Sequence, residues 1–264
     1  ISKYVYAQDI LDTPHYADSE GNVRVAGYTG SIPANTGAGT SSTGFDGGQG
    51  QLGGGAKFGK DITNDNIEGL QAADFTSSFY LLNDTAFRYT SIAAPGLVYN
   101  NDSTELNILL DNSETRGDTI ALVDLGYYSA SVAQVTAQAT SINNSYAASY
   151  YPWLLATDPG TGKATWCPPS TFIPGVYAYN DRVGEPWFAP AGLNRGSLPT
   201  VIRTQRTLTK ANRDTLYEDK VNPIISFPGS GVVVFGQKTL QTKASALDRI
   251  NVRRLLINIK QFLD

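Results

Sequence analysis

Apolar and polar positions follow two different periods in the middle of the chain. Short runs that are mostly apolar, such as Thr119 to Leu125, are typical of strands buried on both faces. Helical spacing is found from Ser103 to Thr115, ended by Gly117, and after Ser129, where Val132, Val135, Ala139 and Ile142 share one side. The expected strands are Phe79 to Leu82, Tyr89 to Ala93, Thr119 to Leu125 and Trp153 to Thr157.

This β-α-β-α-β order predicts a fold class. Strands that alternate with helices form mainly parallel sheets with helices on their faces. We therefore expect an α/β protein, α+β overall, with a layered, mainly parallel sheet flanked by helices over residues 1–195. Residues 196–264 are expected to begin a smaller C-terminal α+β domain, truncated in this chain.

The first 60 residues lack this alternation. Residues 1–30 mix aromatic and β-branched positions with polar ones around Glu20-Gly21-Asn22, which predicts a short β-hairpin. A segment at about 30–60 is rich in Gly, Ser and Thr and has almost no aliphatic residues, so we expect a long loop there.

The C-terminal part carries clear helix and turn signals. Thr209 is expected to cap a helix over 210–219, and two strands should flank Pro228-Gly229-Ser230-Gly231. A final helix is expected to start at Ser245. We expect one stripe of it to pack inward and its basic residues to lie mainly elsewhere. The stripe is Val252, Leu255, Leu256, Ile259 and Leu263, and the basic residues are Arg249, Arg253, Arg254 and Lys260.

Charge is distributed unevenly along the chain. Residues 1–194 hold 8 Lys and Arg against 19 Asp and Glu, whereas residues 195–264 hold 12 against 5. An acidic body and a basic end can attract successive copies head to tail, and contacts of that kind build rings or open helices. Two domains with differently charged solvated faces would give the same asymmetry.

Composition excludes several classes of protein. No apolar run is long enough to cross a bilayer and no secretory leader opens the chain, so no membrane partner is expected. The single Cys167 excludes an internal disulfide. Because the chain starts at Ile1 and contains no methionine, we expect a fragment that is soluble and does not polymerise by itself.

Candidate catalytic and ligand-binding residues are few. The nucleotide-binding patterns at Gly48 to Gly53 and Gly54 to Lys60 lack a preceding strand, and Asp61 stands where a hydroxyl would hold Mg²⁺. One histidine, His15, and one cysteine, Cys167, provide no zinc cluster and no evident nucleophile–base pair. We expect neither catalysis nor a cofactor nor a metal.

One segment, from Tyr150 to Arg195, concentrates aromatic residues and prolines. It holds all three tryptophans, Trp153, Trp166 and Trp187, among seven prolines that fix the backbone. The order of its motifs is Tyr151-Pro152-Trp153, Pro168-Pro169-Ser170, Pro174-Gly175-Val176-Tyr177-Ala178 and Trp187-Phe188-Ala189-Pro190-Ala191-Gly192. Later motifs are Val221-Asn222-Pro223-Ile224, the run from Phe227 to Leu240, and Arg249-Ile250-Asn251-Val252-Arg253-Arg254-Leu255.

These motifs resemble those of contractile tail sheath proteins of myovirus-type phages and related injection machines. The resemblance covers roughly the C-terminal two fifths of the chain, with Phe235 where Trp is usual and Lys238 where Arg is commoner. It implies a structural subunit, not an enzyme, that polymerises helically around a tail tube and contracts to drive the tube through the host envelope.

The resemblance also implies partners and a location. The partners would be other copies of the subunit, the tail tube protein, and the baseplate and tail terminator proteins, with no nucleic acid. The protein would belong to the virion and assemble in the host cytoplasm. Within this interpretation, the candidate subunit-interface residues are Arg249, Arg253, Arg254 and Lys260.

Two other function classes stay open on the sequence alone. One is a hydrolase on an α/β scaffold, which would need His15, Cys167 or a carboxylate pair brought together in a pocket. The other is a carbohydrate-binding or adhesin module, which would need exposed coplanar aromatic rings. The sheath interpretation predicts instead that Trp153, Trp166 and Trp187 pack mostly inward.

Overall fold

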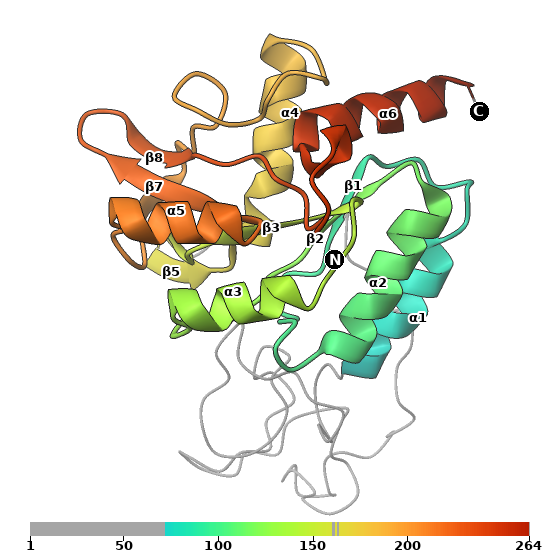
Figure 1. Ribbon diagram of the computed structural model, residues 1–264, viewed down its shortest axis with the longest axis horizontal. Helices are drawn as coiled ribbons and strands as arrows, with labels where there is room; N and C mark the ends of the chain where they lie inside the picture. Colours follow the sequence, from blue (N-terminus) through green and yellow to red (C-terminus); the bar gives the residue numbers. More distant parts are fainter. Residues whose placement is uncertain (1–71, 160–161, 163, 264) are drawn as a thin grey trace, which may run out of the picture. The chain divides into compact units, whose positions relative to one another are not determined.

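The computed structural model describes residues 72–159, 162 and 164–263 (Figure 1). The chain divides into two compact units, Ile1–Asp74 and Phe75–Asp264, and nearly all of the described residues belong to the second. The hairpin predicted in 1–30 and the glycine-rich loop at about 30–60 lie outside the described residues.

The main sheet is mainly parallel, as the sequence predicts. Its strand order is β1-β2-β3-β7-β8; the first four strands run parallel and β8 runs antiparallel to β7. Buried alanines, isoleucines and tyrosines fill its central strands, which suits a sheet covered on both faces. The strands are β1 Ser91–Ala93, β2 Ile120–Leu122, β3 Ala147–Tyr151, β7 Val221–Phe227 and β8 Gly231–Val234.

A smaller antiparallel sheet has the strand order β5-β4-β6. It is formed by β4 Leu154–Thr157, β5 Ala164–Cys167 and β6 Val201–Thr204, with a register shift between Leu155 and Ala156. Because β4 follows β3 after only two residues, the chain passes directly from the large sheet into the small one.

Six α-helices and two short 3₁₀ helices complete the described part of the chain. They are α1 Ala72–Leu82, α2 Ser103–Arg116, α3 Val132–Thr140, α4 Ile173–Val183, α5 Lys210–Glu218, α6 Ile250–Leu263, η1 Pro169–Thr171 and η2 Ala246–Asp248. No described helix is both long and apolar enough to span a membrane.

Several predicted helix ends are confirmed. Gly117 ends α2 in the left-handed region at φ 66°, and the Thr209 side chain accepts a hydrogen bond from the backbone N–H of Asn212 at the start of α5. The cap of α3 is Ser131, which forms a capping box with Gln134, so the prediction of Ser129 was two residues early.

Two element predictions are wrong. Phe79 to Leu82 is the last turn of α1 instead of a strand; Phe79 is buried while Tyr80 and Leu81 face outward, and the ring of Phe75 lies one turn before that of Phe79. The final helix does not run unbroken from Ser245. Ser245 caps η2, and extended backbone at Arg249 separates η2 from α6.

The sheet lies between two sets of helices (Figure 1). In the first set, side chains of α4 and α6 join a core cluster with residues of β2, β3, β7 and β8. In the second set, α2 lies against β2, and α3 and α5 lie against β7. Representative members of the cluster are Ile120, Tyr150, Ile173, Ile224 and Ile257.

Residues after 195 contribute to this same core. β7 pairs with β3, β6 pairs with β4, and the compact unit Phe75–Asp264 spans position 195. Within the described residues, the two predicted domains therefore share one core. That 196–264 begin a larger C-terminal sheath domain stays a prediction.

The three tryptophans differ in placement. Trp153 is buried and donates from Nε1 to the carbonyl of Gly126 at 2.9 Å, as expected for a core residue. Trp166 is half-buried, with its ring centroid 5.1 Å from that of Tyr128. Trp187 is 44% exposed, so the prediction that it packs inward is wrong.

Candidate subunit interface

The predicted interface residues lie on or beside α6, and α6 presents the opposite face from the one expected. Its buried positions are Ile250, Arg253, Arg254 and Ile257, which share one side of the helix. Leu256, Ile259 and Leu263 of the predicted inward stripe are exposed. The arginines therefore belong to the buried face, and the stripe prediction is wrong.

Arg254 connects α6 to α4. Its Nη2 donates to both carboxylate oxygens of Asp181 at 2.7 and 2.6 Å, its Nη1 donates to the carbonyl of Pro186 at 3.2 Å, and its guanidinium lies 4.6 Å from the ring centroid of Tyr177. The residue is only 3% exposed. Paired donors and a stacked ring are what a buried arginine needs to stay charged.

The polar contacts continue from Tyr177 into the sheet. The hydroxyl groups of Tyr150 and Tyr177 are 2.8 Å apart. Burial raises the pKa of Tyr177 to about 12 despite the nearby hydroxyl and Arg254, and burial raises the pKa of Tyr150 well above its usual value. Both phenols are neutral at physiological pH and act as structural links.

Arg253 is held by the segment before β3. Its Nε donates to the carbonyl of Ser145 at 3.1 Å, its Nη2 donates to the Ser145 hydroxyl, and its guanidinium lies 3.8 Å from the ring centroid of Tyr146. Burial lowers its pKa from the usual arginine value. At 4% exposure, Arg253 is as enclosed as Arg254.

Lys260 and Arg249 occupy the two ends of the helix region. Lys260 donates from Nζ to the carbonyl of Arg116 at the end of α2. Arg249 pairs with Asp248 at 3.1 Å and donates to the hydroxyl of Tyr217, and its side chain is partly exposed. The Arg249 side chain is therefore more open to a neighbouring molecule than the buried Arg253 and Arg254.

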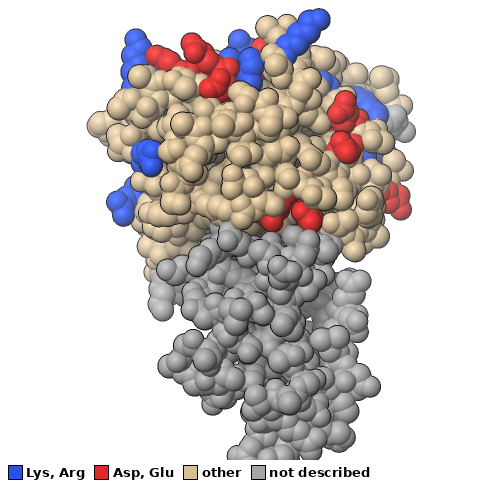
Figure 2. Space-filling model, turned by 60° about the horizontal axis from the view of Figure 1, so that its bottom comes forward, with Lys and Arg blue, Asp and Glu red and all other residues tan. Residues whose placement is uncertain are grey.

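Two of the basic residues on which the electrostatic hypothesis drew, Arg253 and Arg254, are buried. A contact with another subunit stays a prediction for all four residues, but these two would have to leave internal partners to make it. On the face seen in Figure 2, charged residues of both signs lie mainly around the edge of the described surface. That face is not a continuous acidic surface.

Arg116 is a structural centre that the sequence did not reveal. From α2, its guanidinium donates to the carbonyls of Leu82, Asp84 and Phe87 and to both carboxylate oxygens of Asp118. It also lies 4.5 Å from the ring centroid of Tyr89. The only sequence signal is an arginine in the last helical turn, which usually indicates interaction with the helix dipole.

Asp124 and Ser170 join the end of β2 to η1. One Asp124 carboxylate oxygen accepts the Ser170 N–H at 3.2 Å and the other accepts the Ser170 hydroxyl. Burial raises the pKa of Asp124 to about 7, although the two Ser170 hydrogen bonds lower it. The serine of the Pro168-Pro169-Ser170 motif thus has a structural role.

The described residues provide no evident reaction centre. No group of three or more His, Cys, Asp or Glu in this part of the chain could hold a metal, and His15 lies outside it. Burial raises the pKa of the Cys167 thiol, which disfavours the thiolate. A cleft of about 430 Å³ between α4 and residues 197–200 is mostly apolar, and its described lining supplies hydroxyl groups but no carboxylate, imidazole or amine.

Comparison with known proteins identifies the family. The family described as phage tail sheath protein central domain matches residues 65–240. The tail sheath protein of Vibrio phage KVP40 is 47% identical over 96 residues, covering 36% of this chain and 14% of the relative. That of Salmonella phage ViI is 30% identical over 177 residues, covering 64% of this chain and 28% of the relative.

Solved structures give the same fold. The sheath complex of an extracellular contractile injection system (PVC) in its contracted state aligns with a TM-score of 0.57 at 22% identity, covering 74% of this chain and 50% of that one. An anti-feeding prophage baseplate chain also aligns with a TM-score of 0.57, at 23% identity, covering 74% and 51%. The chain spans about a seventh to a quarter of the length of the curated relatives it matches. With the family match extending over two thirds of its residues, this chain belongs to the phage tail sheath protein family.

Proposed function

We propose that this chain is part of a structural subunit of a contractile phage tail sheath, which polymerises helically around the tail tube and contracts to drive the tube through the host envelope. The observation that carries the proposal is the family match over 65–240. Curated relatives that are named tail sheath proteins support it.

The packing of the described unit suits such a role. α6 is bound to α2 through Lys260, to α4 through Arg254 and to the segment before β3 through Arg253. A body tied together in this way moves as one piece while its contacts with neighbours rearrange, which is how large assemblies switch between two states. The work of contraction would come from those contacts.

The proposed subunit would act by binding partner proteins and not by catalysing a reaction. The subunit would bind other copies of itself, the tail tube protein, and the baseplate and terminator proteins, within the virion after assembly in the host cytoplasm. It would need no catalysis, cofactor, nucleic acid or membrane. Head-to-tail charge attraction would then rest on exposed basic residues such as Lys210 and Lys243, since Arg253 and Arg254 are engaged internally.

Electron microscopy of the protein at its natural full length tests this function. Striated hollow tubes, present at micromolar concentration and wide enough to enclose an inner tube, are the expected result. A monodisperse monomer that converts a small-molecule substrate would overturn the proposal and favour the hydrolase alternative.

A further inference from the structure

The motif Trp187-Phe188-Ala189-Pro190-Ala191-Gly192 forms an exposed apolar loop. We call residues 184–193 the tryptophan loop. Trp187 is 44% exposed, and Phe188 and Leu193 in the loop and Val183 just before it are also exposed. A monomeric protein gains nothing from a tryptophan in water, and clustered exposed apolar side chains usually mark a contact surface.

The loop is held firmly from behind. The Asn180 side chain amide donates to the carbonyls of Glu185 and Phe188 at 3.2 and 3.3 Å, and Arg254 donates to the carbonyl of Pro186. Asn251 donates to the carbonyl of Trp187 at 3.4 Å. Four consecutive backbone carbonyl groups, from Glu185 to Phe188, are therefore held by side chains of α4 and α6.

The far end of the loop is fixed as well. Arg195 donates to the carbonyl of Ala189 and lies 5.0 Å from the ring centroid of Phe188. The N–H of Gly192 donates to the carbonyl of Val234 on β8, and Gly192 itself adopts φ 85°, a conformation that favours glycine. Because the loop is already ordered, little conformational entropy is lost when a partner binds.

We propose that the tryptophan loop is a preformed contact surface for a second copy of this chain, with Trp187 as its anchor and Arg254 as a positioning residue. This deepens the proposed function and rests on it. Tryptophan is the residue most enriched among dominant interface contacts, and such residues act best when rigidly presented. Arg254 then serves the interface by shaping the loop, and not by touching the neighbour.

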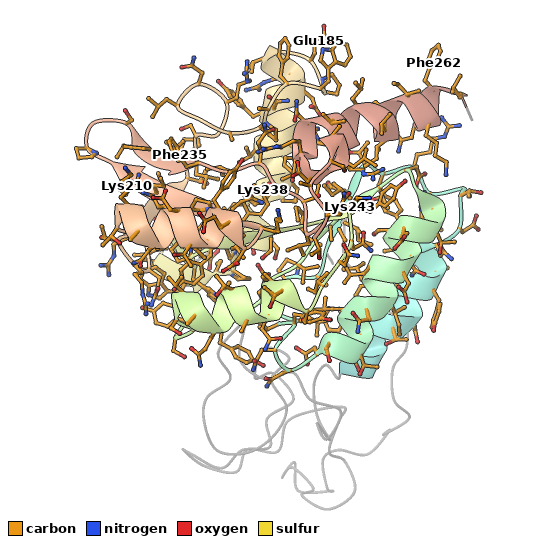
Figure 3. The ribbon with its side chains drawn as sticks, viewed as in Figure 1. Glu185, Lys210, Phe235, Lys238, Lys243 and Phe262 are labelled. Carbon is orange, nitrogen blue, oxygen red and sulfur yellow. The ribbon has the colours of Figure 1, made fainter. Side chains whose placement is uncertain are left out.

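The tryptophan loop follows α4 and lies at its tip, where Figure 3 shows Glu185.

The proposed function argues for a second copy as the occupant, because a subunit that polymerises must contact other copies of itself. When two different surfaces of one chain bind each other between copies, the contact repeats, and it closes into a ring or continues as a helix. Charges of both signs lie in or next to the loop: Glu185 is in it, Arg182 and Arg195 flank it, and Asp181 is paired with Arg254. These charges do not favour a strongly acidic or basic partner over another copy.

Assembly of the full-length protein tests the inference. Trp187→Ala should raise the protein concentration needed for tubes on the order of tenfold or more, with the melting temperature of the unassembled protein nearly unchanged. Phe87→Ala is the matched control, because Phe87 is similarly exposed at 45% but lies outside the loop; it should assemble like wild type. Equal assembly of wild type and Trp187→Ala would overturn the inference while leaving the sheath function intact. If wild type forms no tubes, both fall.

A second measurement identifies the occupant. A photo-crosslinker attached to Leu193→Cys, in a Cys167→Ser background, should join two copies of this chain within assembled tubes and give no crosslink in the dissociated protein. Crosslinking to the tube protein or to another component would overturn the choice of a second copy. So would the absence of any crosslink in tubes.

Discussion

The inner face of α6 buries charged side chains, whereas the tryptophan loop beside it exposes apolar ones. Arg253 and Arg254 are enclosed by backbone carbonyls, hydroxyls, a carboxylate and two tyrosine rings. Trp187, Phe188 and Leu193 lack comparable cover. The two regions touch at the carbonyl of Pro186, where Arg254 donates a hydrogen bond to the loop.

This contrast shows how one region depends on the other. A guanidinium group can be buried when its donors find acceptors, and irregular loops have carbonyl groups that need donors. The hydrogen bond from Arg254 to the carbonyl of Pro186 therefore meets a need of both groups: the arginine gains an acceptor and the loop carbonyl gains a donor. The apolar side chains of the loop take no part in this exchange of hydrogen bonds.

Arg116→Ala provides the strongest test of the buried side of this comparison. The substitution leaves the carbonyls of Leu82, Asp84 and Phe87 and the carboxylate of Asp118 without their shared donor. Removing one partner of a buried, hydrogen-bonded charge typically costs about 3 to 5 kcal/mol. Denaturant unfolding should show a loss of this size, whereas Arg88→Ala, at an exposed arginine nearby, should stay within about 0.5 kcal/mol of wild type. Similar losses in the two variants would mean that Arg116 is not a structural centre.

Arg254→Lys tests the link between the two regions. Lysine keeps the charge but cannot donate to both Asp181 oxygens and Pro186 from a planar group, so we expect a loss of about 2 kcal/mol in unfolding free energy. Amide hydrogen exchange should accelerate in residues 185–193 more than in α2. Arg182→Lys on the exposed side of α4 is the control and should change neither measurement. Uniform acceleration across the unit would contradict a specific role for Arg254 in the loop.

Much of the scaffold was predictable, and the placement of α6 was not. The apolar runs and the signals at Thr209 and Gly117 define β2, α2 and α5 because strand burial and helix capping depend on neighbouring residues. The inward face of α6 depends on partners distant in sequence, such as Ser145 and Asp181. A periodicity count treats arginine as a surface residue, so it predicts that the face of α6 with Arg253 and Arg254 is exposed, whereas that face is buried.

The candidate site shows the same limit. The four basic residues were selected by the sheath resemblance and by their charge, and neither indicates whether an acceptor lies within the chain. The sheath interpretation predicted that Trp187 packs inward. Its exposure follows from the backbone of the loop, which Asn180 and Gly192 fix through contacts that no local pattern reveals.

Asp124 is a buried charged group of the opposite sign to the α6 arginines. Only burial and the hydrogen bonds from Ser170 shift its pKa, and no cation does. That pKa is about 7 in the folded protein against an ordinary 3.8, so between these values the folded state keeps a proton that the unfolded state releases. The contribution to stability is fully present below about pH 4 and is lost as pH rises towards 7. Near the middle of that range the loss is about 1 kcal/mol per pH unit. Asp124→Asn should remove this decline in unfolding free energy measured from pH 4 to 8; parallel curves for the variant and wild type would contradict the assignment.

Trp187→Phe should have the smallest effect on stability of these substitutions, because it changes an exposed residue of the tryptophan loop and not a buried one. Because Trp187 is half in solvent and donates no hydrogen bond within the described residues, the change in unfolding free energy should stay below about 0.5 kcal/mol. Trp153→Phe is the matched variant. It removes the Nε1–H that donates to Gly126 and leaves a space in the core, so a loss of about 1 to 3 kcal/mol is expected. Equal losses for the two tryptophans in the same unfolding experiment would place Trp187 in the core, and the tryptophan loop would then have no free anchor to offer a neighbour.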